Sequence, residues 1–296
     1  MPNSYEYVQN SEQNFIVMDL LGINLAKARR CLEQRYDLKI AIQILIEMVI
    51  SVKEVHKRGF IHRDVKASNF VLDRENRQVF IVDFGLAKKH LDSENQPVPK
   101  RKNADFRGTV SFASLNAHNN VDLARRDDMW SLYFTMLDFL NEKLEWREQR
   151  DFTIVQVKDI KTKCLRNPKR KLWVGPTKQV KEVHDILNHI HSLRYIDMPN
   201  YQLVINNLLQ IYNKYEMIQK QLPGGVIGWE LKSRQVPICA ELTRLDAAMK
   251  MSRQSDFQEY FNSHRSMQAS GLRLGKPELR LFPEVGGHVQ QPVFDI

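Results

Sequence analysis

The sequence contains few cysteines and no long apolar stretch. Its three cysteines, Cys31, Cys164 and Cys239, are far apart and odd in number. This usage argues against a disulfide framework or a zinc site and is typical of reduced thiols in the cytosol or nucleus. No run of 18 apolar residues occurs, and the first ten residues lack a basic segment followed by an apolar one. We therefore expect no membrane span, no signal peptide and a cytoplasmic or nuclear location.

Glycine and proline are also sparse, with 12 and 11 in 296 residues, which excludes a low-complexity class. No glycine precedes Gly22, and no lysine or arginine precedes Lys27. The hydrophobic share of 43% is sufficient for a sizeable core. The length allows one or two domains.

Basic residues exceed acidic ones and give a net charge of +9, which favours acidic partners. The densest basic run lies between residues 158 and 171. One interpretation is a solvated helix face followed by a loop. The other is a contact surface for an acidic or cytoskeletal protein substrate. Nucleic acid is less favoured because no groove-reading or zinc motif accompanies the charge.

Apolar periodicity predicts a mainly α chain with a few short strands. Residues 14–21 are typical of a strand that leads into a connector, and residues 38–56 of a largely buried helix. Short strands are expected at 70–72 and 79–82, around a turn at 73–76. Further helices are expected at 24–32, 129–140, 152–164, 178–190, 201–215 and 240–261. We expect a mobile loop at 87–107, a boundary at 223–225, and extended or disordered residues over the last 30 positions.

The most specific pattern lies in residues 62–85. It consists of His62-Arg63-Asp64, then Lys66 and Asn69, and then Asp83-Phe84-Gly85, which begins nineteen residues after Asp64. Asp64 can orient a nucleophilic hydroxyl, and Lys66 can balance charge on a phosphate. Asn69 and Asp83 can supply oxygen ligands to Mg²⁺. A chance polar loop is the alternative, but this spacing is far more specific than H-R-D alone.

The chain resembles the large lobe of a protein kinase from the interlobe hinge onward. More narrowly, it resembles the casein kinase I group and its tau-tubulin kinase branch. The segments that carry the resemblance are VMDLLGINL at 17–25, HRDVKASNF at 62–70, VDFGLAKK at 82–89, FRGTVSFASLNAHNN at 106–120, RRDDMWSLYFTMLDFL at 125–140 and YQLV at 201–204. The resemblance implies a mainly α (α+β) kinase-like domain over 1–216, with residues 1–21 as a small-lobe remnant and hinge, and residues 22–216 as the large lobe. Residues 217–296 would be a C-terminal extension.

The resemblance also implies a reaction: transfer of the ATP γ-phosphate to serine or threonine of protein substrates, with Mg²⁺. It assigns adenine-pocket roles to Met18, Leu21, Val71 and Val82, catalytic roles to Asp64, Lys66, Asn69 and Thr109, magnesium binding to Asn69 and Asp83, and supporting roles to His62, Arg63 and Asp128. Thr109 would bridge to Asp64 and Lys66, and Asp128 would brace the backbone at residues 62 and 63.

Single residues allow simpler interpretations. Met18 and Val71 could be plain core residues, and Thr109 could belong to a turn. Asp127 and Asp128 could be an exposed pair that caps the first turn of an apolar helix. The joint pattern outweighs these alternatives because each residue falls where one constellation needs it.

Departures from the family bear on activity. Ala67 replaces a proline, Asn200 replaces an aspartate, and Ser111 replaces the arginine of an anion site that reads acidic or phosphorylated substrates. The glycine-rich loop and nucleotide-binding lysine of the family have no counterpart before Gly22. We therefore expect a shortened or incompletely described kinase that is impaired as this chain alone, with a strand at 14–18 that has no sheet to join. A non-catalytic, pseudokinase-type interaction module is the alternative, and a charge-driven binder of nucleic acid or membrane surfaces is a weaker one.

Overall fold

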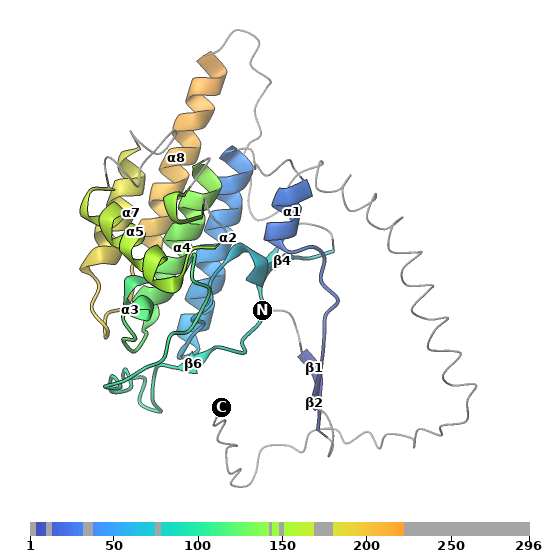
Figure 1. Cartoon of the computed structure of the whole chain (residues 1–296). Coiled ribbons are helices and arrows are strands. Elements are labelled where there is room, and N and C mark those ends of the chain that lie inside the picture. Colours follow the sequence, from blue (N-terminus) through green and yellow to red (C-terminus); the bar gives the residue numbers. More distant parts are fainter. Residues whose placement is uncertain are drawn as a thin grey trace. The chain divides into compact units, whose positions relative to one another are not determined.

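The computed structural model describes residues 4–9, 14–31, 38–74, 78–141, 144–147, 151–168 and 180–221. All of them belong to the first of the two units into which the chain divides, Met1–Asp246. Within these ranges the fold is mainly helical with short strands, as predicted (Figure 1). The predicted helix at 240–261, the boundary at 223–225 and the extended C-terminal residues lie outside the described residues.

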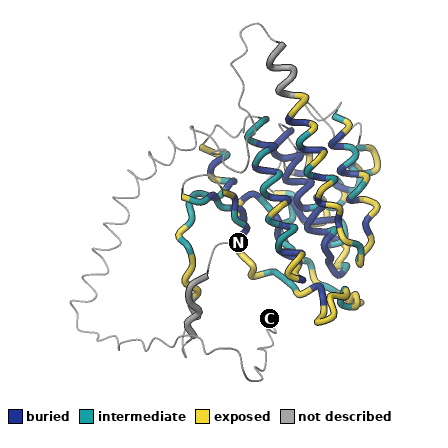
Figure 2. The backbone as a smooth tube through the Cα atoms, turned by 180° about the vertical axis from the view of Figure 1, so that it is seen from behind, coloured by how far each residue is buried: buried dark blue, intermediate teal, exposed yellow. Residues whose placement is uncertain are grey.

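Three long helices form the centre of the fold: α2 (Leu38–Lys57), α4 (Arg125–Leu140) and α8 (Tyr201–Gln221). Helix α2 packs against both of the others (Figure 1). Every residue of α4 except Arg126 and Trp130 is buried. The tube in Figure 2 accordingly shows its buried segments concentrated in this helical region.

Helix α4 begins at Arg125, four residues before the predicted start at 129. The alternative of an exposed acidic pair is wrong, because Asp127 and Asp128 are both buried in its first turn. Buried carboxylates need hydrogen-bond donors, and the surrounding chain supplies them. Those donors, which periodicity does not reveal, explain the earlier start.

The shorter helices are α1 (Leu25–Cys31), α3 (Leu115–His118), α5 (Ile154–Arg166) and α7 (Lys181–Ser192), with 3-10 turns at Ala67–Asn69 and Glu145–Arg147. Helix α5 begins two residues after its predicted start because Thr153 caps it. The Thr153 hydroxyl accepts a hydrogen bond from Gln156 N at 3.3 Å, and the Gln156 side chain accepts one from Thr153 N at 2.8 Å.

The strands form antiparallel pairs: β1 (Ser4–Gln9) with β2 (Asn14–Met18), β3 (Phe60–Ile61) with β6 (Lys88–Lys89), and β4 (Phe70–Leu72) with β5 (Val79–Ile81). The expectation that the strand at 14–18 has no sheet to join is wrong, since β2 pairs with β1. Tyr7 and Val8 in β1 are residue types that favour strands, and their pairing with Ile16 and Phe15 supplies part of the missing ladder.

The connector after β2 runs beside the β4–β5 hairpin. Gly22 N donates to Leu72 O at 2.8 Å, and Leu72 N donates to Ile23 O at 2.9 Å. A Cβ atom at Gly22 would lie 2.9 Å from Asp73 O, so the close approach requires glycine. The hairpin and the connector are thereby joined into one small layer. Among the described helices, none is both long and apolar enough to cross a membrane.

The buried His90 makes stability depend on pH. Its ring is fully buried, neither ring nitrogen has a hydrogen-bond partner among the described residues, and Tyr195 lies edge-on at 5.3 Å between centroids. Burial, followed by the charge of Arg125, lowers the His90 pKa to about 4. The folded protein therefore keeps this ring neutral where the unfolded chain, with a pKa of about 6.5, takes up a proton.

We predict that the free energy of unfolding falls as the pH is lowered from 6.5 to 4, with His90 contributing up to about 1.4 kcal/mol per pH unit. Urea denaturation at several pH values across this range measures the free energy of unfolding, which should fall less steeply with decreasing pH for His90→Phe than for the original chain. An equal dependence on pH in the two proteins would contradict this role of His90.

Candidate functional site

The β4–β5 hairpin brings two segments of the H-R-D and D-F-G pattern together. Phe70 pairs with Ile81, and Val82 N donates to Asn69 O at 2.9 Å. Asn69 therefore lies at the same end of the hairpin as Asp83, which follows Val82 directly. The H-R-D and D-F-G motifs are thus separated in sequence by one short hairpin, which brings them together in space.

Asp64 lies at the centre of a compact set of contacts. Its Oδ2 is 2.6 Å from Lys66 Nζ and 3.1 Å from Asn69 Nδ2. Its Oδ1 accepts a hydrogen bond from the Thr109 hydroxyl at 2.7 Å, and Lys66 Nζ donates to the same hydroxyl at 2.8 Å. Asp64 is buried except for 8% of its surface, so the carboxylate is held from three sides.

Gly108 allows Thr109 to reach this set from a distant part of the chain. It adopts φ +102°, and a Cβ atom there would lie 2.6 Å from Arg63 O. Any side chain would separate the two segments. Glycine at this position thus explains how a hydroxyl 45 residues away contacts Asp64.

Asn69 and Asp83 present oxygens that suit a hard cation. Asn69 Nδ2 donates to Asp64 O at 2.9 Å as well as to the Asp64 carboxylate, which leaves its amide oxygen as an acceptor. Asp83 is exposed, adopts φ +64°, and accepts from Gly85 N at 3.4 Å. An amide oxygen and a carboxylate are ligands that Mg²⁺ prefers, so these residues fit that ion.

Asp128 supports the loop that carries Asp64. Its two carboxylate oxygens accept hydrogen bonds from His62 N at 2.7 Å and Arg63 N at 2.8 Å. Burial by itself would raise the Asp128 pKa, but the hydrogen bonds of His56 and the loop amide hold the pKa below its usual value. The Arg63 backbone, at φ +67°, is fixed by this contact.

Sequence reasoning missed one partner of Asp128, His56, and the tyrosine that His56 contacts in turn. His56 Nε2 lies 2.8 Å from Asp128 Oδ2, and its Nδ1 lies 2.7 Å from the Tyr201 hydroxyl. His56 is in α2 and Tyr201 is in α8, 145 residues apart in sequence. The one available signal was a histidine in the last turn of a largely apolar helix.

His62 and Arg63 also join the two motifs to each other. His62 Nε2 lies 3.1 Å from Val82 O, and its ring lies 5.2 Å from that of Phe84. Arg63 Nε donates to Leu86 O. The loop before Asp64 and the segment after Asp83 therefore form one unit.

The proposed adenine-pocket residues are brought together in part. Val71 in β4 and Val82, directly after β5, are both half-buried, and Asn24 in the connector forms a bridge to Val71. Leu21 is half-buried just before Gly22, which bonds to the hairpin. Met18 lies at the end of β2 with 45% of its surface exposed.

A second buried carboxylate, Asp122, was also missed. Lys88 Nζ donates to its oxygens at 2.7 and 2.8 Å, and Arg101 donates from both its backbone and its guanidinium. Burial would raise the Asp122 pKa, but Arg101 and Lys88 hold the pKa well below its usual value. Residues 87–107, expected to be a mobile loop, are therefore fixed at two points and also contain β6.

Lys161 departs most clearly from the expected solvated basic face. It is fully buried on α5, and its Nζ donates to Val110 O at 2.9 Å and Ala113 O at 2.7 Å, with the Phe134 ring 4.6 Å away. Burial lowers the Lys161 pKa well below its usual value. Trp146 Nε1 donates to Ser111 O at 2.9 Å. Lys161 and Trp146 thus donate hydrogen bonds to three backbone carbonyl oxygens of residues 110–113.

Removing the charge of Asp128 should be costly. We predict that Asp128→Asn lowers the free energy of unfolding by about 3 kcal/mol or more, because buried donors lose a charged acceptor. Urea denaturation measures this loss. Asp105→Asn is the control, since Asp105 is mostly exposed and pairs with Arg107 at 3.3 Å, and it should change stability by less than about 1 kcal/mol. Similar losses in both variants would contradict the supporting role.

Lys161→Met tests the hold on residues 110–113. The variant keeps the unbranched stem of the side chain but leaves two carbonyl oxygens without their donor, so we expect a loss of about 1–3 kcal/mol. Hydrogen exchange of the amides in residues 110–113 should also become faster. Lys163→Met is the control, because Lys163 is exposed and pairs with Asp159 across one helical turn. Unchanged exchange in the Lys161 variant would contradict this role.

Comparisons with known proteins agree with this geometry. The protein kinase domain matches residues 3–207. A probable serine/threonine-protein kinase of Dictyostelium discoideum is 34% identical over 197 residues, which cover 65% of this chain and 38% of that protein. The matched part therefore spans well under two thirds of the relative. The mainly helical fold with few strands also agrees with the predicted large lobe. The chain belongs to the protein kinase domain family.

Proposed function

We propose that this domain is built for transfer of the ATP γ-phosphate to serine or threonine of protein substrates. The observation that carries the proposal is the set of contacts around Asp64, in which Lys66, Thr109 and Asn69 surround one carboxylate. Asp64 would accept the hydrogen bond of the substrate hydroxyl and orient it. Lys66 would face the transferred phosphate, and Thr109 would keep the two side chains in register.

The cofactor assignment follows from the donor chemistry. Magnesium-bound ATP supplies the phosphoryl group in this family. Asn69 and Asp83 would hold the ion through oxygen atoms. Leu21, Val71 and Val82 would contact adenine, with Met18 at the edge of that pocket.

Within the family, we assign the chain to the casein kinase I group and its tau-tubulin kinase-like branch. A general kinase has Ala-Pro-Glu where this chain has Ser114-Leu115-Asn116. The replacement has its own anchor, because the Ser114 hydroxyl and the Asn116 amide donate to Asp127 Oδ1 at 2.6 and 2.8 Å. This contact supports the assignment to that group. The assignment in turn suggests acidic or cytoskeletal proteins as substrates.

Activity of these 296 residues by themselves is expected to be low. The sequence offers no glycine before Gly22 and no lysine or arginine before Lys27 that could cover or clamp the phosphates. Phosphoryl transfer depends on prearranged charge in a site that excludes water. Each loss of about 1.4 kcal/mol of transition-state stabilisation reduces the rate tenfold.

A non-catalytic interaction module is the second candidate. The exposed apolar side chains of Met18, Leu20 and Phe84, at 45%, 72% and 36%, favour it because a partner could cover them. A charge-driven binder of nucleic acid or membranes is less supported, since Lys161 in the basic run is buried.

Nucleotide binding and phosphate transfer test these candidates separately. We predict weak ATP binding by the purified chain that depends on Mg²⁺ and is lost in Asp83→Ala, measured by calorimetry. Incorporation of phosphate into an acidic protein such as casein should not exceed that of the same variant. Binding that ignores both Mg²⁺ and Asp83 would favour the interaction module. Clear incorporation would show that the chain is not impaired.

A further inference from the structure

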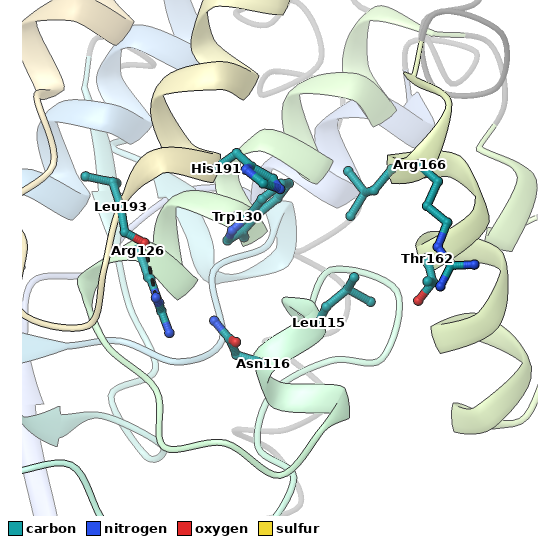
Figure 3. Close-up of a pocket in the computed structure, with 9 residues that line it drawn as sticks. Leu115, Asn116, Arg126, Trp130, Thr162, Arg166, His191 and Leu193 are labelled. Carbon is teal, nitrogen blue, oxygen red and sulfur yellow. Dashed lines mark hydrogen bonds between the residues drawn. The ribbon is translucent and has the colours of Figure 1, made fainter.

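A cavity of about 340 Å³ lies among α3, α4, α5 and α7 (Figure 3). Its apolar walls are Leu115, Trp130, Leu165 and Leu193. No residue of the H-R-D or D-F-G pattern lines it. Its size is within the range of sites that take a large apolar group.

The polar groups of the cavity are mainly basic. Arg126, Arg166 and His191 line it, and none of its described lining residues is acidic. Arg126 and Arg166 lie on opposite sides of the cavity in Figure 3, while His191 lies beside Trp130, with ring centroids 6.3 Å apart. Positive groups around an apolar hollow favour a ligand with an apolar body and a negative rim.

The two guanidinium groups of the cavity are incompletely hydrogen-bonded within the described part of the chain. Arg126 Nη1 donates to Leu193 O at 3.1 Å. Its buried Nε lies 3.8 Å from Asp127 Oδ2 but has no hydrogen-bond partner there. Arg166 is exposed in the last turn of α5 and makes no ion pair with any described residue. Guanidinium groups bind carboxylates through paired hydrogen bonds.

Two residues that line the cavity are close in sequence to residues 110–113 or to Lys161, which holds that segment. Leu115 follows Ser114, directly after residues 110–113, and Thr162, another lining residue, follows Lys161 itself. A polypeptide lying across that segment would pass close to the cavity. A protein segment is therefore favoured over a free small acid.

We propose that this cavity binds an acidic peptide segment of a partner protein, with one large apolar side chain inserted beside Trp130 and neighbouring carboxylates on Arg166 and Arg126. The proposal does not rest on the catalytic one, because binding is measured without nucleotide. Loss of phosphate transfer would leave it unaffected.

The test uses the full chain and a fluorescein-labelled peptide in which one phenylalanine is flanked by glutamates. Fluorescence anisotropy should rise and saturate. Arg166→Glu should weaken binding about tenfold or more, since a hydrogen bond to a charged group is replaced by repulsion. Arg30→Glu is the matched control, because Arg30 is also an exposed arginine in the last turn of a helix, α1, and its replacement changes the net charge equally. It should leave affinity unchanged.

A second variant tests the cavity without altering charge. Thr162→Trp places a large side chain on its wall and should abolish binding, with unfolding curves of both variants confirming that they fold. Peptides with phenylalanine changed to alanine, or glutamates to glutamines, should bind at least tenfold more weakly.

Several results would overturn the proposal. They are the absence of saturable binding up to about 1 mM peptide, equal weakening by Arg166→Glu and Arg30→Glu, and unchanged binding by Thr162→Trp. Displacement by 3-phenylpropionate at the affinity of the peptide would identify a small apolar acid as the ligand instead.

Discussion

The carboxylate of Asp128 is the constraint on which the arrangement of the site depends. A buried charge is tolerated only where donors converge on it. Here the donors come from the loop at residues 62–63 and from α2 through His56, which in turn contacts Tyr201 of α8. The hydrogen bonds to the Asp128 carboxylate therefore fix the three central helices and the loop before Asp64 relative to one another. The left-handed backbone of Arg63 is maintained by the same contact.

Three buried carboxylates within seven residues, at the start of α4 and just before it, act in this way. Asp122 holds Lys88 and Arg101, Asp127 holds Ser114 and Asn116, and Asp128 holds the loop before Asp64. The two carboxylates in the first turn of the helix also lie where the helix dipole favours negative charge. Each carboxylate fixes a different segment of residues 62–116. One helix end thus organises both the loop that carries Asp64 and the long segment that returns Thr109 to it.

Sequence reasoning located the local elements and the motif, and failed where partners are distant. The apolar runs at 70–72 and 79–82 around the turn at 73–76 indicated a hairpin because both strands and the turn lie within one short stretch, and β4 pairs with β5 as expected. The Tyr201 contact to His56 spans 145 residues, and no periodicity encodes it. The isolated strand expected at 14–18 was wrong because β1 was not recognised as its partner. Lys161 was included in a solvated basic run because charge alone does not reveal that carbonyl oxygens and an aromatic ring surround it.

The buried Lys161 also changes how the basic character of the chain should be understood. Its amine is directed to the backbone of residues 110–113 from beneath, and Trp146 holds Ser111 through the carbonyl oxygen. The side chain at 111 is a serine and brings no positive charge to this segment. Basic side chains instead line the neighbouring cavity, at Arg126 and Arg166. If the chain recognises acidic proteins, the arginines of this cavity therefore provide the positive charge for that recognition, and residues 110–113 do not.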